Sequence, residues 1–301
     1  MFEAMILCAG LGTRLMPLTR ELPKPLVPIG DRPVLAHLLD HLHAEGGTLR
    51  VVNAHHRPER IQQFVEAEEP DATVSFEPSL LGTAGGVVAA KARFGPGRLI
   101  VWNGDILARP ALRQLAGWAP QYPIVLSVHR RTRGEGTCGI DEHGRLVRLR
   151  GRMFGEEVHG ADYLGVFGVL RALLDQFPSR GCLVGDFLLP YLDEGHTVMT
   201  QCERESFVDI GSIDRYHAEN LRWLDTTTRG DSWIHPRATV APSNRVEAVR
   251  GGRRRSNHWG GASRARCRLA GCHRTSTLAR CRRYGGRRCR APRVVLAPRR
   301  E

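Results

Sequence analysis

The chain has 301 residues, of which 42% are hydrophobic, and a formal net charge of +13 at pH 7. This length supports one large α/β domain with a small appendage. No apolar run is long enough to span a bilayer, and the N-terminus lacks the basic region of a signal peptide. We therefore expect a cytoplasmic protein without a membrane partner.

The positive charge is concentrated at one end of the chain. Residues 245–301 contain 18 arginines, no lysine and only two acids, Glu247 and Glu301, which gives this segment a net charge of +16. Residues 1–244 carry the difference, −3, so the body is mildly acidic. The eight cysteines lack CxxC spacing, which argues against a zinc site.

Apolar runs and helical periodicity alternate through the first half of the chain. Leucines at positions 35, 38, 39 and 42 follow the helical spacing, between Pro33 and Gly46. The predicted strands cover residues 4–9, 49–53, 73–76, 99–102 and 124–128, and the other predicted helices follow Pro58 and cover 85–93. This alternation predicts a mainly parallel sheet covered on both faces, with ligands at the carboxyl ends of its strands.

The pattern is less regular after residue 145. We expect strands over 162–169 and 206–211, a helix over 213–224, and the start of a hexapeptide β-helix coil over 233–240. The six-residue rhythm ends near Ser243. The predicted domains are a catalytic domain (1–228), a β-helix-like coil (229–243) and an Arg-rich tail (244–301).

Two interpretations of the tail remain open. A run such as the three arginines at 253–255 is typical of a basic arm for nucleic acid or membrane. However, aromatic residues are few and no amphipathic face is present. We favour a frameshift in GC-rich DNA after about Ser243, which yields a disordered, dispensable segment with no specific nucleic-acid partner.

A glycine-rich segment, Gly10-Leu11-Gly12-Thr13-Arg14-Leu15, follows the first predicted strand. Such a segment exposes backbone N–H groups that can bind phosphate, and Arg14 adds a permanent cation. It fits neither the dinucleotide fingerprint nor the P-loop. An ordinary strand-to-helix turn is the alternative.

Lys24 lies between Pro23 and Pro25, which fix the backbone that presents it. The chain has only two lysines, Lys24 and Lys91, against 42 arginines. A lysine retained in so arginine-rich a chain indicates a site that needs a compact ammonium group. The alternative is a surface lysine without a function.

A second glycine loop spans residues 81–86 and precedes a predicted helix, where it can place backbone against a base or ribose. Asp105 follows Gly104 just after one predicted strand, and Asp209 lies two residues before Gly211, where another predicted strand meets a turn. Two carboxylates of this kind suit a hard divalent cation that also holds phosphate oxygens. Taken singly, each aspartate is more often a turn residue.

Five ordered motifs together resemble the sugar-1-phosphate nucleotidyltransferase family over residues 1–225. They are Gly10-x-Gly12-Thr13-Arg14, Pro23-Lys24-Pro25, Leu81-Gly82-Thr83-Ala84-Gly85, Asn103-Gly104-Asp105 and Asp209-Ile210-Gly211. The chain is most similar to a bacterial branch in which mannose-1-phosphate guanylyltransferases merge with uridylyltransferases such as those for N-acetylmuramate 1-phosphate. The resemblance implies a Rossmann-like mixed sheet with helices on both faces, followed here by an incomplete β-helix start.

The resemblance also implies roles for individual residues. Arg14 and Lys24 would be catalytic, Asp105 and Asp209 would hold Mg²⁺, and the product would be an NDP-sugar plus pyrophosphate. Asn103, Asp162 and Gly165 would bind the sugar. The nucleotide would be bound by Gly10, Gly12, Thr13, Arg14, Glu77, Gly82, Thr83 and Ala84.

The nucleotide and the sugar are less defined than the reaction. Glu77, as a base-reading carboxylate, favours GTP with mannose 1-phosphate over UTP with an amino-sugar 1-phosphate. The family's second lysine, on the sugar phosphate, has no counterpart; one of the arginines at 148, 150 and 152 is expected to replace it. A non-catalytic nucleic-acid-binding relative is the third alternative, against which the intact Arg14, Lys24, Asp105 and Asp209 argue.

Overall fold

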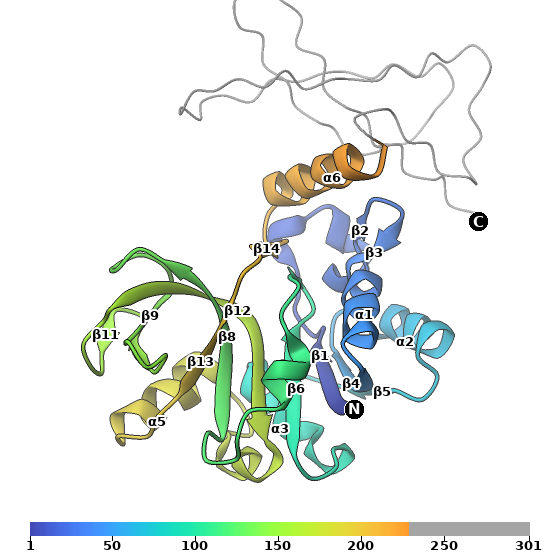
Figure 1. The fold of residues 1–301 in the computed structure, drawn as a ribbon. Coiled ribbons are helices and arrows are strands. Elements are labelled where there is room, and N and C mark those ends of the chain that lie inside the picture. Colours follow the sequence, from blue (N-terminus) through green and yellow to red (C-terminus); the bar gives the residue numbers. More distant parts are fainter. Residues whose placement is uncertain (229–301) are drawn as a thin grey trace, which may run out of the picture. The chain divides into compact units, whose positions relative to one another are not determined.

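The computed structural model describes residues 1–228 (Figure 1). The β-helix start expected at 229–243 and the Arg-rich tail expected at 244–301 lie outside these described residues. Within the described part, no helix combines the length and the apolar character that crossing a membrane requires.

A parallel half of the sheet carries the N-terminal motifs. Four strands lie side by side in the order β6, β1, β4 and β5, and each neighbouring pair is parallel. Because they are parallel, their carboxyl ends meet at one edge of the sheet. The strands are β1 (Phe2–Leu7), β4 (Gly47–Ala54), β5 (Thr73–Phe76) and β6 (Arg98–Asn103).

The sheet changes direction at β12 (His159–Leu170), which pairs antiparallel with β6, β8 and β9. The prediction of a mainly parallel sheet is therefore wrong for this half, because residues 124–170 form five successive strands with no helix between them. The mixed sheet implied by the family resemblance is confirmed. The remaining strands are β8 (Ile124–Arg131), β9 (Cys138–Ile140), β10 (Leu146–Leu149), β11 (Arg152–Met153) and β13 (Met199–Glu203).

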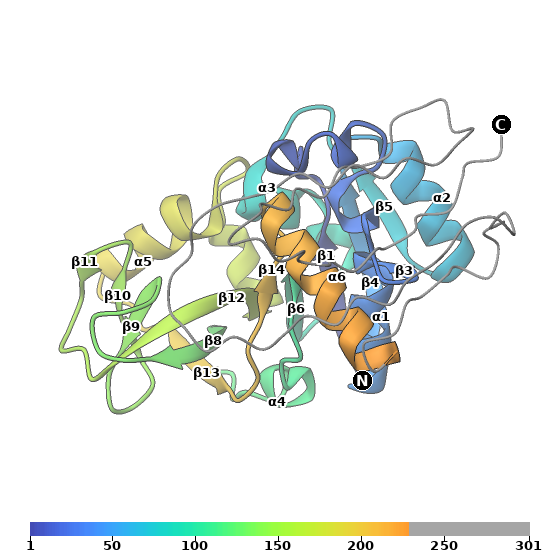
Figure 2. The same cartoon turned by 90° about the horizontal axis from the view of Figure 1, so that it is seen from above.

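Helices cover both faces of the parallel half, with α1 and α4 on one side and α3 on the other (Figure 2). The strand residues Met5, Val51 and Val101 share one buried cluster with Ala84 and Val87 of α3. The helices are α1 (Val34–Ala44), α2 (Pro58–Glu68), α3 (Gly82–Ala89), α4 (Leu112–Ala116), α5 (Leu189–Asp193) and α6 (Ile213–Thr228).

Helix α1 confirms the leucine pattern. Leu35 and Leu42 are fully buried, and Leu38 and Leu39 are at most 4% exposed. Each such burial contributes roughly 1.5–3 kcal/mol to stability. Gly46 follows the helix with φ +80°, a backbone conformation that favours glycine and ends the helix.

Helix α3 begins three residues earlier than predicted, so the second glycine motif forms its first turn and not a loop before it. Tertiary packing decides this. A Cβ on Gly82 would lie 2.4 Å from the carbonyl oxygen of Gly181, and one on Gly85 would lie 2.7 Å from that of Ser179. The glycines lower the helix propensity by up to about 1 kcal/mol each, but they let segment 179–181 pack directly against the helix.

The described backbone divides into two units, one formed by Met1–Pro28 with Arg32–Tyr216 and the other by Ile29–Asp31 with residues 217–228. All the predicted site residues belong to the first unit. In the second, the N–H of Gly30 donates to Oδ1 of Asn220 at 2.9 Å. A Cβ on Gly30 would lie 2.1 Å from the Trp223 ring, so only glycine fits there.

Candidate active site

The first glycine motif follows β1 at the carboxyl edge of the parallel strands. The motif enters the 3-10 turn Thr13–Leu15 and no regular α-helix follows it directly, which argues against the alternative of an ordinary strand-to-helix turn. Gly12 has φ +64°, and a Cβ there would lie 2.8 Å from the Thr19 side chain. The Thr19 hydroxyl donates to the Gly12 carbonyl at 2.8 Å and fixes the bend. Exposed Gly10, Thr13 and Arg14 therefore sit on a well-supported loop.

Lys24 lies between its two flanking prolines and is buried at the start of another 3-10 turn, Lys24–Leu26. Only 7% of the residue is exposed. Its ammonium contacts the Asp105 carboxylate and lies 3.7 Å from Oδ1 of Asp209. A buried ammonium is costly unless carboxylates compensate it, so the three residues form one electrostatic unit.

A short two-stranded pairing brings the two aspartates together. Strand β14 (Val208–Asp209) pairs antiparallel with β7 (Ile106–Leu107), and Asp209 lies opposite Ile106. The Ile210 N–H also donates to the Asp105 carbonyl at 3.0 Å. The segment after β6 is thereby joined to a segment about one hundred residues later in the chain.

The carboxylates retain unused capacity to bind a cation. Oδ1 of Asp209 is buried and accepts no hydrogen bond from the described residues, while Oδ2 accepts one from Arg215 at 3.2 Å. The described residues contain no cluster of three or more His, Cys, Asp and Glu side chains that could hold a metal alone. Two carboxylates, one of which has an oxygen without a hydrogen bond, suit an oxygen-preferring ion whose other ligands come from phosphate and water.

Glu77 requires a correction. Only 1% of the residue is exposed, and both carboxylate oxygens are bonded inside the protein. Oε1 accepts a hydrogen bond from Nδ2 of Asn53 at 2.7 Å, and Oε2 accepts one from the Leu81 N–H at 3.0 Å. The prediction that Glu77 reads the base by direct contact is therefore wrong in this geometry, because the carboxylate faces the interior.

The other residues predicted to bind the nucleotide lie in the first turn of α3. Gly82 is exposed, Thr83 is half-buried and Ala84 is fully buried. The Thr83 hydroxyl accepts a hydrogen bond from the Leu183 N–H at 2.7 Å, and the Ala84 N–H donates to the Gly181 carbonyl at 3.0 Å. The Ala84 side chain cannot contact a ligand because it packs into the core.

On the predicted sugar side, Asn103 and Gly165 are neighbours. Gly165 has φ +67°, and a Cβ there would lie 2.7 Å from Nδ2 of Asn103. The glycine thus leaves space for the Asn103 amide, which ends β6 near Asp105. The structure brings these two predicted residues together.

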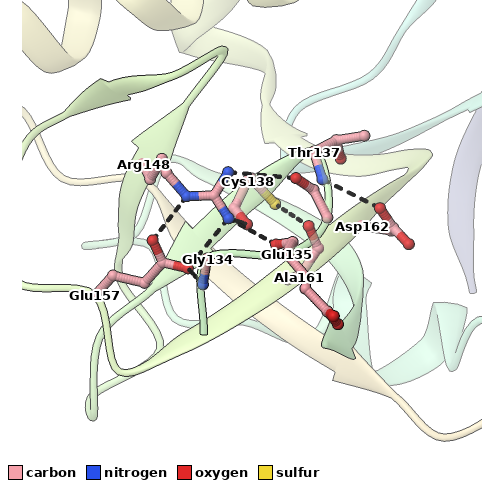
Figure 3. A network of polar contacts seen from close by, with 9 residues as sticks. Gly134, Glu135, Thr137, Cys138, Arg148, Glu157, Ala161 and Asp162 are labelled. Carbon is pink, nitrogen blue, oxygen red and sulfur yellow. Dashed lines mark hydrogen bonds and ion pairs between the residues drawn. The ribbon is translucent and has the colours of Figure 1, made fainter. Parts of the chain in front are cut away.

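Asp162 belongs to a different network, drawn in Figure 3, at the loop between β8 and β9. One carboxylate oxygen accepts from Nε of Arg131 at 2.6 Å and the other from the Thr137 N–H at 3.1 Å. Both oxygens thus have partners within the protein, and the predicted contact with sugar stays a prediction.

The same network contains Arg148, one of the three arginines that could replace the missing lysine. Nε of Arg148 donates to Oε2 of Glu157 at 2.7 Å, and Nη2 donates to the Cys138 carbonyl (Figure 3). The hydrogen bond from Arg148 holds the pKa of Glu157 below its ordinary value, although burial opposes this. The guanidinium of Arg148 is therefore occupied by partners within the protein and stabilises the fold.

Of the remaining two arginines, Arg152 forms an ion pair with Asp193. Arg150 is exposed, has the unusual φ of +47°, and makes no ion pair with a carboxylate among residues 1–228. Its Nη2 lies 3.6 Å from Sγ of Cys182, next to the Leu183 N–H that binds Thr83. Arg150 is thus the arginine of the three that remains available to an anion.

Sequence reasoning missed the role of Asn53, whose side chain contacts both Glu77 and the N–H of Cys8. In the sequence it stands out as a polar residue near the end of an apolar strand. It also missed Arg215, which binds Asp209 from α6, and no sequence pattern indicates that contact.

Comparison with known proteins agrees with this geometry. Residues 3–129 match the sequence model of the nucleotidyl transferase family. The chain is 36% identical over 233 residues to the mannose-1-phosphate guanyltransferase of Aspergillus fumigatus, an alignment covering 74% of this chain and 60% of that protein. The chain therefore spans about 60% of the length of this relative.

Two further proteins are similar to this chain. The D-glycero-alpha-D-manno-heptose 1-phosphate guanylyltransferase of Campylobacter jejuni is 28% identical over 166 residues, which cover 54% of this chain and 75% of that protein. The crystal structure of HddC from Yersinia pseudotuberculosis complexed with GMP-PN matches with a TM-score of 0.62 at 22% identity, covering 74% of this chain and all of that chain. The structural likeness confirms the α/β fold class.

Proposed function

From the match of residues 3–129 to the model of the nucleotidyl transferase family, we propose that the chain transfers a nucleoside monophosphate from an NTP to a sugar 1-phosphate. The products are an NDP-sugar and pyrophosphate. The observation that carries the proposal is the buried contact of Lys24 with Asp105, beside Asp209. The cytoplasmic location stays a prediction.

The chain's own residues suit a reaction between two phosphate groups. Such transfer needs positioning and charge neutralisation more than covalent help. Lys24 offers an ammonium with little access to water, and Arg14 offers an exposed guanidinium beside the N–H groups of the first glycine loop. Together they can bind the triphosphate and offset the charge that grows on the attacked phosphorus.

A divalent ion, Mg²⁺ in this proposal, would be held by Asp105 and Asp209. When bound, it supplies a positive charge that neutralises and orients phosphate oxygens. The buried Oδ1 of Asp209, which accepts no hydrogen bond from the described residues, supports this assignment. Lys24, which contacts Asp105 and lies near Asp209, offsets part of their negative charge in the absence of the ion.

For the substrates we propose GTP and mannose 1-phosphate. The support comes from the guanyltransferase and guanylyltransferase relatives. Glu77 no longer supports guanine, because its carboxylate is bonded to Asn53 and Leu81. UTP with an amino-sugar 1-phosphate is the competing outcome of the experiment below.

Arg150 is proposed to bind the phosphate of the sugar 1-phosphate. Its exposed guanidinium forms no ion pair with a carboxylate of residues 1–228, and Leu183, next to its neighbour Cys182, binds Thr83 at the start of α3. A planar guanidinium suits a phosphate group, which it can bind through two parallel hydrogen bonds. Arg148 and Arg152 already pair with carboxylates and are weaker candidates.

The proposal is tested by measuring pyrophosphate release by the full chain with Mg²⁺, across four NTPs and a panel of sugar 1-phosphates. We expect the highest kcat/KM with GTP and mannose 1-phosphate. A higher kcat/KM with UTP would overturn the nucleotide assignment alone. Absence of turnover with every pair would overturn the proposed reaction.

A further inference from the structure

We propose that the buried pair Asn53 and Glu77 is a positioning device that holds the two glycine motifs in register for nucleotide binding. This inference rests on the proposed function. Asn53 lies near the end of β4 and is 3% exposed; Glu77 follows β5 and is 1% exposed. Neither side chain reaches solvent, so any effect on a ligand must pass through the groups they bind.

The pair links the two motifs by three consecutive hydrogen bonds. The Cys8 N–H, two residues before Gly10, donates to Oδ1 of Asn53 at 2.6 Å. Nδ2 of Asn53 donates to Oε1 of Glu77 at 2.7 Å. Oε2 of Glu77 accepts from the Leu81 N–H, immediately before Gly82, at 3.0 Å. Each connection is made at the base of a motif, outside its exposed residues.

The residues that follow Asn53 make parallel connections to the same segments. A ring nitrogen of His55 donates to the Glu77 carbonyl at 2.8 Å. A ring nitrogen of His56 donates to the carbonyl of Thr19, the residue whose hydroxyl fixes Gly12. Arg57, the next residue, has a φ of +52°, which is unusual for a residue with a side chain. Such a strained backbone persists only where the surrounding contacts enforce it.

Helix α3 closes over the pair. A Cβ added to Gly86 would lie 2.8 Å from Nδ2 of Asn53 and 2.8 Å from Oε1 of Glu77. The pair is therefore enclosed between the strand ends and the helix. A donor or acceptor left unpaired in such a site carries its full desolvation penalty, so the protein must shift a motif to relieve it.

The polarity of the hydrogen bonds provides a sharp test. In Asn53→Asp, two carboxylates face each other where a donor met an acceptor. In Glu77→Gln, the new amide directs a donor at either Asn53 or the Leu81 N–H. In the double variant N53D/E77Q, the new carboxylate at position 53 can accept from Cys8 and from the new amide at position 77, whose oxygen accepts from Leu81. All three bonds and the net charge are then restored.

The experiment measures the Kd of GTP with Mg²⁺ by calorimetry, without sugar phosphate, together with kcat, KM and Tm. We expect each single variant to lose GTP affinity and kcat/KM by on the order of 10- to 100-fold. The double variant should recover to within a few-fold of the original protein. Ser127→Ala is the control, because it removes a buried hydrogen bond to Glu203 at 2.9 Å that is remote from both motifs.

Five outcomes separate the explanations. Unchanged GTP affinity in both single variants, or a double variant no better than the weaker single variant, overturns the positioning role. The same loss of affinity in Ser127→Ala at an equal drop in Tm also overturns it, since general destabilisation would then suffice. A full chain that binds GTP but turns over no sugar phosphate overturns only the proposed reaction; one that binds no NTP overturns both.

Discussion

The ammonium of Lys24 lies 3.7 Å from Oδ1 of Asp209, a buried oxygen that accepts no hydrogen bond from the described residues. Lys24 also contacts Asp105. The ammonium is thus shared between two carboxylates that arrive from separate parts of the chain. A substitution that removes one carboxylate therefore leaves Lys24 with the other carboxylate as its partner.

Removing either carboxylate should abolish Mg²⁺-dependent turnover without unfolding the protein. Asp105→Asn or Asp209→Asn leaves Lys24 with one carboxylate, which keeps its charge partly compensated. We expect losses of at least about 100-fold in kcat/KM, given the several kcal/mol attributed to charge stabilisation by bound metal. Asp40→Asn, which alters an exposed ion pair with Arg32, is the control. Turnover within about tenfold of the original for either site variant would contradict the metal assignment.

Lys24→Met should lower kcat much more than it changes the KM for NTP. The negative charge near Lys24 grows toward the transition state, so its loss affects the barrier more than ground-state binding. Lys91→Met is the control, because it makes the same substitution at a lysine that forms an exposed ion pair with Asp175. This variant should retain normal kinetics. Similar steady-state constants for the two variants would argue against a special role for Lys24.

Arg150→Ala should raise the KM for the sugar 1-phosphate by roughly tenfold, a typical contribution of a charge-assisted hydrogen bond, while the Kd of GTP changes little. Arg152→Ala removes a neighbouring arginine that is already paired with Asp193 and should leave this KM unchanged. The KM values can be obtained from initial rates at saturating GTP, and the Kd by calorimetry. Equal KM values for Arg150→Ala and the original protein would assign the phosphate to another residue.

The rate at which Cys182 is alkylated should indicate whether nucleotide binds beside Thr83. Burial raises the pKa of its thiol. Hydrogen bonds from the N–H groups of Gly185 and Val184 and from Thr83, together with the charge of Arg150, lower the pKa by a larger amount, so the net shift is downward. The reactive thiolate therefore forms at lower pH than for an ordinary thiol. By contrast, burial raises the pKa of Cys138 to about 12.

Peptide-resolved mass spectrometry after brief iodoacetamide treatment at about pH 7–8 should find Cys182 labelled well before Cys138. GTP with Mg²⁺ should slow labelling of Cys182, because Thr83 contacts the same segment. Faster labelling of Cys138, or no protection by saturating GTP, would contradict the placement of the nucleotide beside Thr83.

Much of the fold follows from local patterns. The leucine spacing of α1 and the apolar strands before Gly10 and Asn103 are visible in sequence because each element must bury one face. The antiparallel half was less predictable. Strand β12 pairs with β6, β8 and β9 at once, and no local pattern reveals partners that lie so far away in the chain.

The sequence by itself determined the residues available for chemistry: the glycine loops, Arg14, a lysine between prolines and two aspartates beside glycines. Only the tertiary structure decided which of them meet. The β14–β7 pairing joins Asp209 to Asp105, and packing buries Glu77 against Asn53 and α3. The physical reason is that the identity of a charged residue is local, whereas its burial and partners depend on segments distant in sequence. The position of Glu77 in the sequence thus indicated a contact with ligand, but its burial and its hydrogen bonds to Asn53 and Leu81 give it a structural role.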